Sequence, residues 1–385
     1  MKTVTILGAT GSVGTSTLDL IERDPEQFQV LALTANSDVT KLAAAAIRTN
    51  ARRAVVADER CLDALREALA GTGIEAAGGA QAVTDTAELG ADLTMGAIVG
   101  CAGLEPVLAA VDQGRTVIIA NKEPLVSAGD VVLAAAAKSG ATLLPADSEH
   151  NAIFQCFDAA RPNRVRRIIL TCSGGPFREK SLEQMRTMTP KQAVAHPNWS
   201  MGAKISVDSA TLFNKGLELI EAARLFPVPH DAIEIVIHPQ SVIHSLVEYI
   251  DGSTLAQLGP PDMRVPIASC LAWPDRMATP MEPLDLVKIG RLDFEAPDPV
   301  RFPALRLARE ALDAGGARPA ILNAANEVAV AAFLGGDIRF LEIAAIVEDT
   351  LTRYDPPAPG ALADVLAVDE EARVITAARV KDCVA

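Results

Sequence analysis

Three carboxylates at separate places in the chain have the types and positions expected of a divalent-cation site. Asp147 and Glu149 follow a predicted strand that ends near Leu144, and Glu218 lies far downstream on a predicted helix. Alternate residues of an extended chain point the same way, so we expect Asp147 and Glu149 to face one cation. Three carboxylates with open coordination positions suit Mg²⁺ or Mn²⁺. The alternative is that the Asp-x-Glu pair consists of solvated loop acids or helix caps.

Glycines punctuate the first predicted strand-to-helix turn, which reads Gly8-Ala9-Thr10-Gly11-Ser12-Val13-Gly14. Such a turn permits the close approach of a pyrophosphate, whose charge is stabilised by backbone N–H groups at the start of the helix. The spacing is G-x-x-G-x-x-G, not G-x-G-x-x-G, and the alternative is a simple turn of an α/β protein. Its position directly after the opening strand favours a dinucleotide site.

The loop after the second predicted strand normally distinguishes NAD from NADP. Here it contains Asn36-Ser37-Asp38 without an Arg or Lys, and Lys41 follows one helical turn later. Asn36 and Ser37 can donate hydrogen bonds to a 2′-phosphate, whereas Asp38 would repel one. The residues themselves therefore leave the choice of cofactor open.

A group of small donors and one histidine has the composition of a phosphate pocket. Ser173 follows a predicted strand, Ser209 is expected to cap a helix that carries Asn214 and Lys215 on the face of Glu218, and His196 lies in a loop. Hydroxyls, amides and one ammonium together suit a phosphate. Each of these residues also has an ordinary alternative role as a helix cap, a turn residue or a loop residue.

The loop 196–202 is predicted to close over a substrate. Its Trp199 and Met201 would ordinarily be buried, and in a loop bounded by Gly and Pro we interpret them as the apolar face of a lid. Lys122 follows another predicted strand, at the sheet edge where the glycine turn and Asp147 are expected. That position favours a functional role for Lys122 over a solvated one.

Alternating β-branched and Ala/Leu-rich segments predict an α/β fold with a doubly wound, Rossmann-like parallel sheet over residues 1–147. Successive strand-like runs then predict an α+β catalytic domain over 148–273, followed by a proline-rich linker over 274–303 and a small helical domain over 304–385. A helix is predicted over 210–225. The strands of the first domain are expected at 4–7, 30–33, 54–57, 93–99, 116–120 and 141–144.

Composition excludes several classes of function. The 385 residues carry a formal net charge of −14, which argues against a nucleic-acid partner. No apolar stretch approaches the roughly 18 residues of a membrane helix, and the N-terminus lacks the pattern of a signal peptide. The 6 cysteines are far apart without a C-x-x-C pair, as expected of reduced thiols in a cytoplasm.

Together these strings resemble the 1-deoxy-D-xylulose 5-phosphate reductoisomerase family. The resemblance spans about the whole chain, and the strings within 144–155 and 196–218 are highly specific. The matching segments are Gly8–Gly14, Ala120–Glu123, Leu144–Gln155, Ser173–Phe177, His196–Gly202, Lys204–Thr211, Asn214–Glu218 and Asn323–Glu327.

The resemblance implies a homodimer that uses NADPH and Mg²⁺ or Mn²⁺ to convert 1-deoxy-D-xylulose 5-phosphate to 2-C-methyl-D-erythritol 4-phosphate in isoprenoid precursor biosynthesis. It implies metal ligands at Asp147, Glu149 and Glu218, which form the catalytic set with Lys122. It implies substrate contacts from Lys122, Ser148, Glu149, Ser173, His196, Ser209, Asn214, Lys215 and Glu218. It implies dinucleotide contacts from Thr10, Gly11, Ser12, Val13, Asn36, Ser37, Asn121, Glu123 and Gly202. The chain departs from the family at 36–38, where members generally have a Gly or Asn, a basic residue and an Asn.

Two other functions are compatible with parts of the pattern. A simple NAD(P)-dependent dehydrogenase would share the nucleotide domain, and it would need neither a divalent cation nor a ketose phosphate. A nucleotide-sensing regulator would need the glycine turn alone, which would leave the carboxylates and the phosphate pocket without a purpose.

Overall fold

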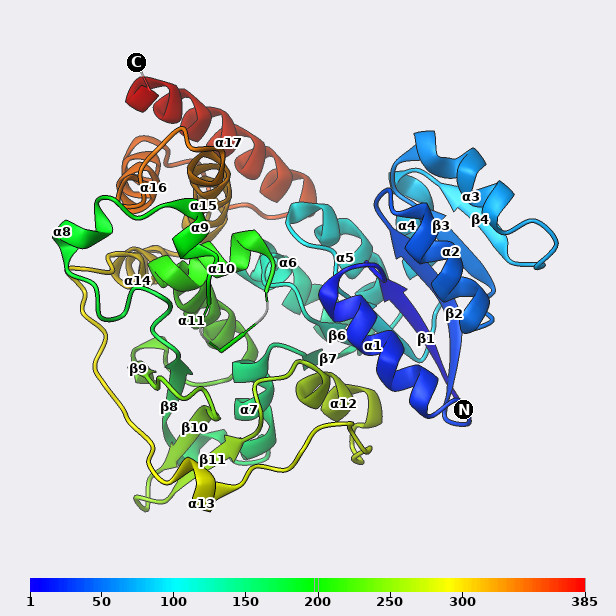
Figure 1. Cartoon of the computed structure of the whole chain (residues 1–385), viewed down its shortest axis with the longest axis horizontal. Coiled ribbons are helices and arrows are strands. Elements are labelled where there is room, and N and C mark those ends of the chain that lie inside the picture. The colour runs from blue at the N-terminus through cyan, green and yellow to red at the C-terminus, as the bar shows by residue number, and fades with distance from the viewer. Residues whose placement is uncertain (197, 200, 385) are drawn as a thin grey trace. The chain divides into compact units, whose positions relative to one another are not determined.

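The computed structural model describes residues 1–196, 198–199 and 201–384 of the chain (Figure 1). These residues form two compact units. The first unit comprises Met1–Pro124, Asp130–Asn151 and Met263–Met281, and the second comprises Leu125–Gly129, Ala152–Asp262 and Glu282–Ala385. Pro197, Ser200 and Ala385 lie outside the described residues, and two of them fall in the predicted lid loop.

The first unit is built on a 7-stranded sheet in the order β4-β3-β2-β1-β5-β6-β7. All its strand pairs are parallel, which confirms the doubly wound α/β fold. The strand order reverses beside β1, so the carboxyl ends of β1 and β5 border the crevice where ligands of such sheets bind. The strands are β1 (Lys2–Leu7), β2 (Phe28–Ala35), β3 (Arg53–Val56), β4 (Glu75–Gly78), β5 (Leu93–Gly96), β6 (Thr116–Ile119) and β7 (Thr142–Pro145).

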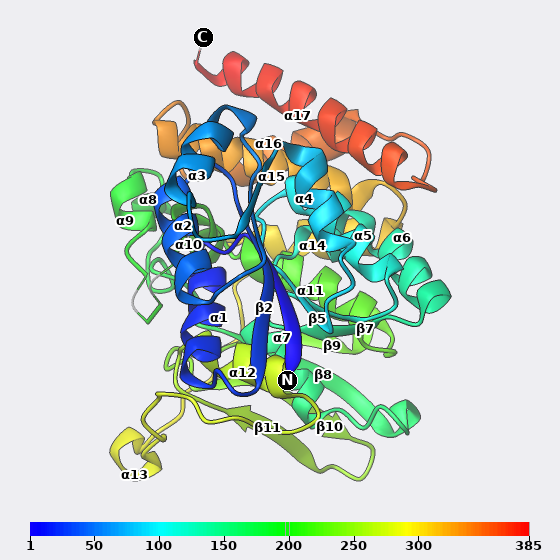
Figure 2. The same ribbon diagram turned by 90° about the vertical axis from the view of Figure 1, so that its right-hand side faces the viewer.

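Helices cover both faces of this sheet. Figure 2 shows α1, α2 and α3 on one side of the strands and α4 and α5 on the other. Their bounds are α1 (Ser12–Arg23), α2 (Val39–Arg48), α3 (Leu62–Ala68), α4 (Ala80–Ala87), α5 (Leu104–Asp112) and α12 (Arg264–Ala272), with 3₁₀ turns η1 (Glu59–Cys61) and η2 (Cys101–Gly103). Two further helices, α6 (Glu123–Ser139) and α7 (Ser148–Cys156), contain residues of both units.

The second unit contains a 4-stranded sheet in the order β11-β10-β8-β9. Strands β8 and β9 run parallel, whereas β10 is antiparallel to both β8 and β11, which confirms the predicted change to an α+β arrangement. The bounds are β8 (Val165–Cys172), β9 (Ile233–Ile237), β10 (Ile243–Tyr249) and β11 (Thr254–Leu258).

The helix predicted over 210–225 is confirmed but begins three residues later, at Phe213, and a separate helix that was not predicted precedes it. Helix α10 (Ala203–Thr211) ends and α11 (Phe213–Leu225) begins at Leu212, whose backbone is left-handed with φ of 63°. A left-handed leucine costs about 1–2 kcal/mol. The Leu212 side chain is only 1% exposed, and its burial in the hydrophobic core offsets that cost.

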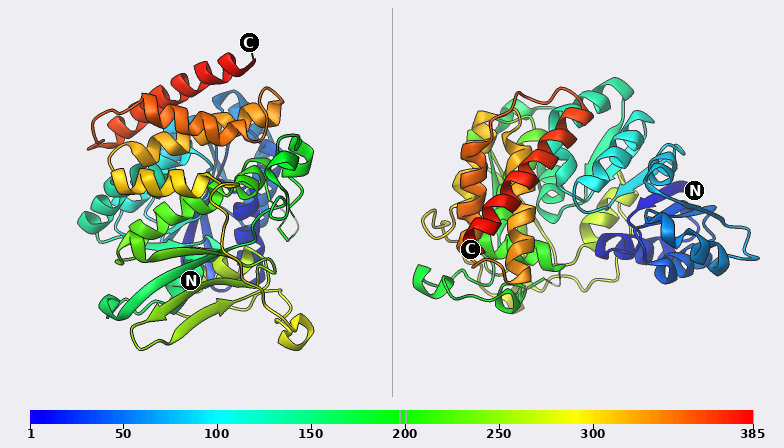
Figure 3. Two further views of the ribbon diagram at one scale, coloured as in Figure 1. Left: turned by 90° about the vertical axis from the view of Figure 1, so that its left-hand side faces the viewer. Right: turned by 90° about the horizontal axis from the view of Figure 1, so that it is seen from above.

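Four long helices form the C-terminal part of the second unit, which confirms the prediction that this part is helical (Figure 3). Helix α15 packs against α14, α16 and α17, while α14 also packs on α11. Aromatic side chains bind this bundle to the preceding loops, and the ring of Phe177 meets that of Phe340 edge-on at 4.9 Å. The bounds are α14 (Ala304–Ala314), α15 (Arg318–Gly335), α16 (Glu342–Arg353) and α17 (Leu362–Val384).

Short elements connect these parts of the second unit. They are η3 (Pro162–Arg164), α8 (Leu182–Met185), α9 (Pro190–Ala193), η4 (His230–Ala232) and α13 (Leu286–Ile289). The six cysteines are all free, as their spacing predicts. Among the described residues, none of the helices is long and apolar enough to cross a membrane.

Candidate active site

The glycine turn between β1 and α1 is shaped for close approach. Gly8 has φ of +88°, and a Cβ added there would lie 2.6 Å from the carbonyl oxygen of Ala97. A Cβ on Gly14 would lie 2.4 Å from the carbonyl oxygen of Gly8. Helix α1 begins after Gly11, which supplies no side-chain cap. Its first amides, near Thr10, Ser12 and Val13, therefore face an open end where a pyrophosphate is stabilised.

Asn121 gives a second indication of a bound dinucleotide. Its side chain is buried at the carboxyl end of β6, and neither its Oδ1 nor its Nδ2 has a hydrogen-bond partner within the described part of the chain. A buried amide without partners is costly unless a ligand satisfies it. The neighbouring Glu123 is also buried, at the start of α6. These residues and the glycine turn fit the pyrophosphate and the nicotinamide half of NADPH.

In the loop at 36–38, the charge of Asp38 is compensated by a partner, so Asp38 should repel a phosphate less than its sequence position suggests. Asp38 is the N-cap of α2, where its carboxylate accepts the backbone N–H of Lys41 at 3.0 Å and pairs with the Lys41 ammonium at 3.1 Å. These bonds hold the pKa of Asp38 below its ordinary value, the backbone bond being the larger cause. Asn36 and Ser37 are exposed beside it. The acid is therefore partly neutralised by its own helix.

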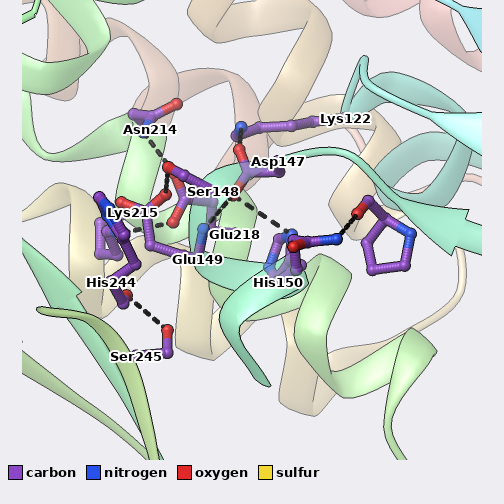
Figure 4. A network of polar contacts seen from close by, with 12 residues as sticks. Lys122, Asp147, Ser148, Glu149, His150, Asn214, Lys215, Glu218, His244 and Ser245 are labelled. Carbon is purple, nitrogen blue, oxygen red and sulfur yellow. Dashed lines mark hydrogen bonds and ion pairs between the residues drawn. The ribbon is translucent and has the colours of Figure 1, made fainter. Parts of the chain in front are cut away.

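Lys122 and Asp147 meet at the carboxyl edge of the first unit's sheet. They follow the paired strands β6 and β7, and the Lys122 ammonium donates a hydrogen bond to Asp147 Oδ2. Figure 4 shows the two side chains pointing at each other. His150 also approaches Asp147, with its Nδ1 3.6 Å from Oδ1. Sequence reasoning gave His150 no role, although its position three residues after Asp147 places it one helical turn away.

The expectation that Asp147 and Glu149 converge because the chain is extended is wrong. Residues 148–156 form helix α7, so Glu149 lies in a first helical turn. Asp147 accepts the backbone N–H of Glu149 at 3.1 Å, as a capping residue does. The Ser148 hydroxyl donates to Glu149 Oε2 at 2.5 Å. The two acids are therefore held near each other by a helix cap.

Glu218 is the centre of the corresponding cluster in the second unit. Asn214 donates to its Oε1 at 2.5 Å, and the Lys215 ammonium donates to its Oε2. All three lie on α11, which confirms the predicted shared face, and Figure 4 shows Asn214 and Lys215 directed at Glu218. Lys215 is only 2% exposed. A carboxylate and an ammonium this deeply buried require each other or another charged partner.

Both acidic positions fit a cation by the chemistry of their donors. Within the first unit an ammonium contacts Asp147, and within the second an ammonium contacts Glu218. Each carboxylate is largely withdrawn from water, where an uncompensated charge is costly. Carboxylate oxygens are also the ligands that Mg²⁺ and Mn²⁺ prefer. Each buried carboxylate therefore favours a positive partner, and a lysine ammonium occupies the place that a divalent cation would take.

Ser173 and His196 are brought together at the end of β8. The Ser173 hydroxyl accepts the backbone N–H of Gly175 at 3.1 Å and lies 2.9 Å from His196 Nε2. His196 Nδ1 accepts two backbone N–H groups, from Asn198 at 3.2 Å and from Trp199 at 3.0 Å. An imidazole that accepts at Nδ1 carries its proton on Nε2. His196 is therefore a neutral donor aimed at Ser173.

Ser209 joins this group from inside a helix. It lies in the last turn of α10, so the expectation that it caps a helix is wrong. The turn at Gly175 packs tightly against it, since a Cβ on Gly175 would lie 2.5 Å from the carbonyl oxygen of Ser209. The structure thus brings Ser173, His196 and Ser209 to one place in the second unit.

The loop predicted as a lid is anchored by a residue that sequence reasoning missed. Asn198 Nδ2 donates to the Pro239 carbonyl at 2.7 Å and to Ser241 Oγ at 3.2 Å. Trp199 lies beside His244, with ring centroids 6.1 Å apart, and Met201 is half-buried. Gly202 is the exposed N-cap of α10. The anchoring role of Asn198 could not be predicted, because an asparagine next to a proline indicates only a turn.

Acidification should loosen this loop through His196. Burial lowers the pKa of His196 below 6.5, so the folded state favours the neutral ring. Its contribution to stability is complete above the unfolded pKa near 6.5 and is lost as the pH falls through the folded pKa, at no more than about 1.4 kcal/mol per pH unit. We expect the urea concentration at the unfolding midpoint to decrease when the pH is lowered from 7.5 to 5.5. The decrease should be smaller in His196→Asn than in the wild type. Equal slopes for both proteins would contradict this.

The chain matches three family models. One is described as 1-deoxy-D-xylulose 5-phosphate reductoisomerase and matches residues 4–129. The C-terminal domain of 1-deoxy-D-xylulose 5-phosphate reductoisomerase matches residues 143–226. The DXP reductoisomerase C-terminal domain matches residues 258–375. The three matches together extend over most of the chain.

Curated relatives and solved structures agree with these matches. The 1-deoxy-D-xylulose 5-phosphate reductoisomerase of Zymomonas mobilis is 62% identical over 377 residues, which cover 98% of this chain and 97% of the relative. The solved enzyme from Zymomonas mobilis in complex with NADPH has a TM-score of 0.95 and 60% identity, and the match covers 98% of this chain and 99% of that one. A DOX-P reductoisomerase solved with NADPH, fosmidomycin and magnesium has a TM-score of 0.93 and 43% identity, with 99% and 98% covered.

Proposed function

The chain belongs to the 1-deoxy-D-xylulose 5-phosphate reductoisomerase family, and from this membership we infer what each part of its site does. It is an NADPH-dependent oxidoreductase of isoprenoid precursor biosynthesis that converts 1-deoxy-D-xylulose 5-phosphate to 2-C-methyl-D-erythritol 4-phosphate. A bound divalent cation supplies Lewis-acid polarisation of the substrate oxygens, and NADPH supplies the hydride. The chain's own residues bind and orient the substrate and exclude water.

Asp147, Glu149 and Glu218 are the proposed ligands of one divalent cation. The observation that carries this proposal is the pairing of Asp147 and Glu218 with lysine ammonium groups in sites largely closed to water. Lys122 orients the carboxylate of Asp147 and is proposed to contact the substrate's carbon chain together with Ser148 and Glu149. His150 restricts Asp147 from the other side. Fixed ligands of this kind set the geometry of the cation.

The substrate's phosphate is the proposed ligand of Ser173, His196, Ser209, Asn214 and Lys215. The neutral imidazole of His196 offers an N–H at Nε2, and Ser173 and Ser209 offer hydroxyls. Lys215 supplies the positive charge. A phosphate is remote from the reacting carbons, so its binding energy is available to position them. The loop 196–202 excludes water when it closes over the bound substrate.

NADPH is the proposed ligand of the first unit's glycine turn, of Asn36 and Ser37, and of Asn121 and Glu123. Gly202, from the second unit, is proposed as a further dinucleotide contact. Support comes from the turn, where Gly8 and Gly14 leave no room for a Cβ, and from the Asn121 amide, which lacks a partner among the described residues. The proposed domain division has dinucleotide binding in 1–147, catalysis in 148–273, a linker at 274–303 and a helical domain in 304–385.

Ser37→Arg should strengthen the preference for NADPH over NADH. The side chain at 37 is exposed beside the Asp38–Lys41 pair, and a guanidinium there can contact a 2′-phosphate. We expect the dissociation constant of NADH divided by that of NADPH, both measured by fluorescence titration, to rise by roughly tenfold. Ser37→Gln is the control without charge. An unchanged ratio would mean that another residue reads the 2′ position.

The proposed assembly is a cytoplasmic homodimer. Six free cysteines are compatible with a reducing compartment. Strand β11 is an edge of the second unit's sheet and carries the exposed Leu255, which is the type of edge that a second copy can cover. Sedimentation velocity of the full chain measures the assembly directly, and a concentration-independent monomer would contradict it.

One assay distinguishes the proposed function from its alternatives. The protein is freed of metal with a chelator and incubated with the ketose phosphate and NADPH, and Mg²⁺ or Mn²⁺ is then added. We expect NADPH oxidation and rearranged product only after the cation is added. Oxidation without a cation on an ordinary aldehyde would indicate a simple dehydrogenase, and tight dinucleotide binding without product would indicate a regulator.

A further inference from the structure

The cation that recognises the 2′-phosphate of NADPH is missing from the loop where this fold usually carries it. The loop after β2 has only Asn36, Ser37 and Asp38, and the one nearby lysine, Lys41, is paired with Asp38. An NADP site in a doubly wound sheet generally uses an arginine to accommodate this phosphate. The inference that follows rests on the proposed function and concerns which residue replaces that arginine.

The loop after β3 runs directly beside the loop after β2. Beyond the strand ends, the backbone N–H of Ala57 donates to the carbonyl of Ala35 at 2.8 Å, and that of Asp58 donates to the carbonyl of Asn36 at 3.0 Å. Two successive hydrogen bonds continue the parallel pairing of β2 and β3 past the sheet. Residues 57–60 are therefore fixed next to the segment that borders the adenosine ribose.

Arg60 is the cation that this loop carries. Its guanidinium binds Asp58 in a two-pronged manner, with Nε 2.9 Å from Oδ1 and Nη2 2.8 Å from Oδ2. The Arg60 side chain is nevertheless 90% exposed, so it is accessible to a ligand. Arg52 and Arg53 lie before or at the start of β3, at the opposite edge of the sheet. The Asp58 contact holds Arg60 at the loop in a geometry that also matches two phosphate oxygens.

We propose that Arg60 binds the 2′-phosphate of NADPH, exchanging its contact with Asp58 for the phosphate, and that it determines the preference of this chain for NADPH. A phosphate carries more negative charge than a carboxylate and presents three acceptor oxygens. The guanidinium makes a two-pronged contact before the exchange, with Asp58, and after it, with the phosphate. Asp38 does not oppose this contact strongly, because it stays paired with Lys41.

The test is the binding of NADPH and NADH to the full-length protein, followed by fluorescence, with adenosine 2′,5′-bisphosphate as a competitor that lacks the nicotinamide. Arg60→Gln should weaken NADPH and the bisphosphate by about tenfold or more while leaving NADH within about twofold. Arg66→Gln is the matched control, because Arg66 lies on helix α3, after the loop, and also pairs with an aspartate, Asp63 of the same helix. It should leave all three ligands unchanged.

Three further outcomes decide the matter. If Arg60→Gln weakens NADPH and NADH equally or neither, the proposal is wrong, and a loss of preference in Lys41→Gln alone would assign the role to Lys41. The double variant Asp58→Asn/Arg60→Gln should remain weak for NADPH, and a return to the wild-type ratio would show that the single variant only exposed Asp58. Failure of the wild-type protein to bind either dinucleotide would instead contradict the proposed function.

Discussion

Glu218→Gln should lower kcat by about a thousandfold or more and remove most of the affinity for Mn²⁺. The substitution keeps the size of the side chain and removes its charge, and the Lewis-acid contribution of a metal amounts to several kcal/mol, with 1.36 kcal/mol for each factor of ten. The surroundings make the amide a poor substitute. Asn214 and Lys215 both donate to Glu218, so a glutamine NH₂ must face one of these donors. Steady-state kinetics and a calorimetric Mn²⁺ titration measure the two effects.

Glu221→Gln is the matched control for this substitution. Glu221 lies three residues further along α11, is 1% exposed, and undergoes the same chemical change without belonging to the proposed site. We expect it to retain Mn²⁺ binding even if it costs stability, which thermal unfolding reports separately. If Glu218→Gln kept both its turnover and its dependence on metal, Glu218 would not be a ligand.

Lys215→Met should lower kcat/KM for the ketose phosphate by roughly 10- to 100-fold. A charge-assisted hydrogen bond to an ionised group contributes about 1.5–3 kcal/mol, and the phosphate loses its only proposed ammonium partner. The same change leaves Glu218 buried without the Lys215 ammonium, and this loss is expected to lower the free energy of unfolding by about 3–5 kcal/mol. Kinetics at a temperature well below the unfolding transition, measured by circular dichroism, separate the two effects.

The dephosphorylated ketose supplies the decisive comparison. If Lys215 contacts the phosphate, Lys215→Met and the wild type should differ little on this poorer substrate, whereas damage to the metal site or the fold would lower both rates together. Lys191→Met, an exposed lysine of α9, removes the same charge from the same unit and should change neither rate. An equal loss on both substrates would place Lys215 away from the phosphate.

Periodicity was sufficient to predict the parallel sheet, but not every element in it. Six of the seven strands carry the β-branched or leucine-rich runs that indicate burial. Strand β4, Glu75–Gly78, consists of small residues and a glutamate at the sheet edge, and it has no such signal. Helix α4, which follows it, was missed for the same reason, because Ala80–Ala87 contains three threonines or acids among its alanines. Edge elements are partly solvated, and their sequences are therefore weakly patterned.

Motifs located the candidate residues better than local geometry did. The shared face of Asn214, Lys215 and Glu218 follows from helical spacing alone. The sequence predicted Lys122 and Asp147 at one edge of the sheet, but not their direct contact, which depends on the pairing of β6 with β7. The start of helix α7 at Ser148 was not predicted, because residues 147–149 were interpreted as extended chain when Asp147 is a cap. Long-range pairing and capping both depend on tertiary structure.

The left-handed backbone at Leu212 limits how this segment can evolve. Glycine would adopt the angle without strain but would leave a hole where the core expects a leucine, and a β-branched residue would fill the hole but resist the angle. A saturation library at this codon should therefore return active clones mainly with leucine or methionine, which has a similar volume and no β-branch, even though the side chain touches no reactant. Drift in this stretch of the gene is confined by a requirement of shape, independent of the chemistry performed on either side of it.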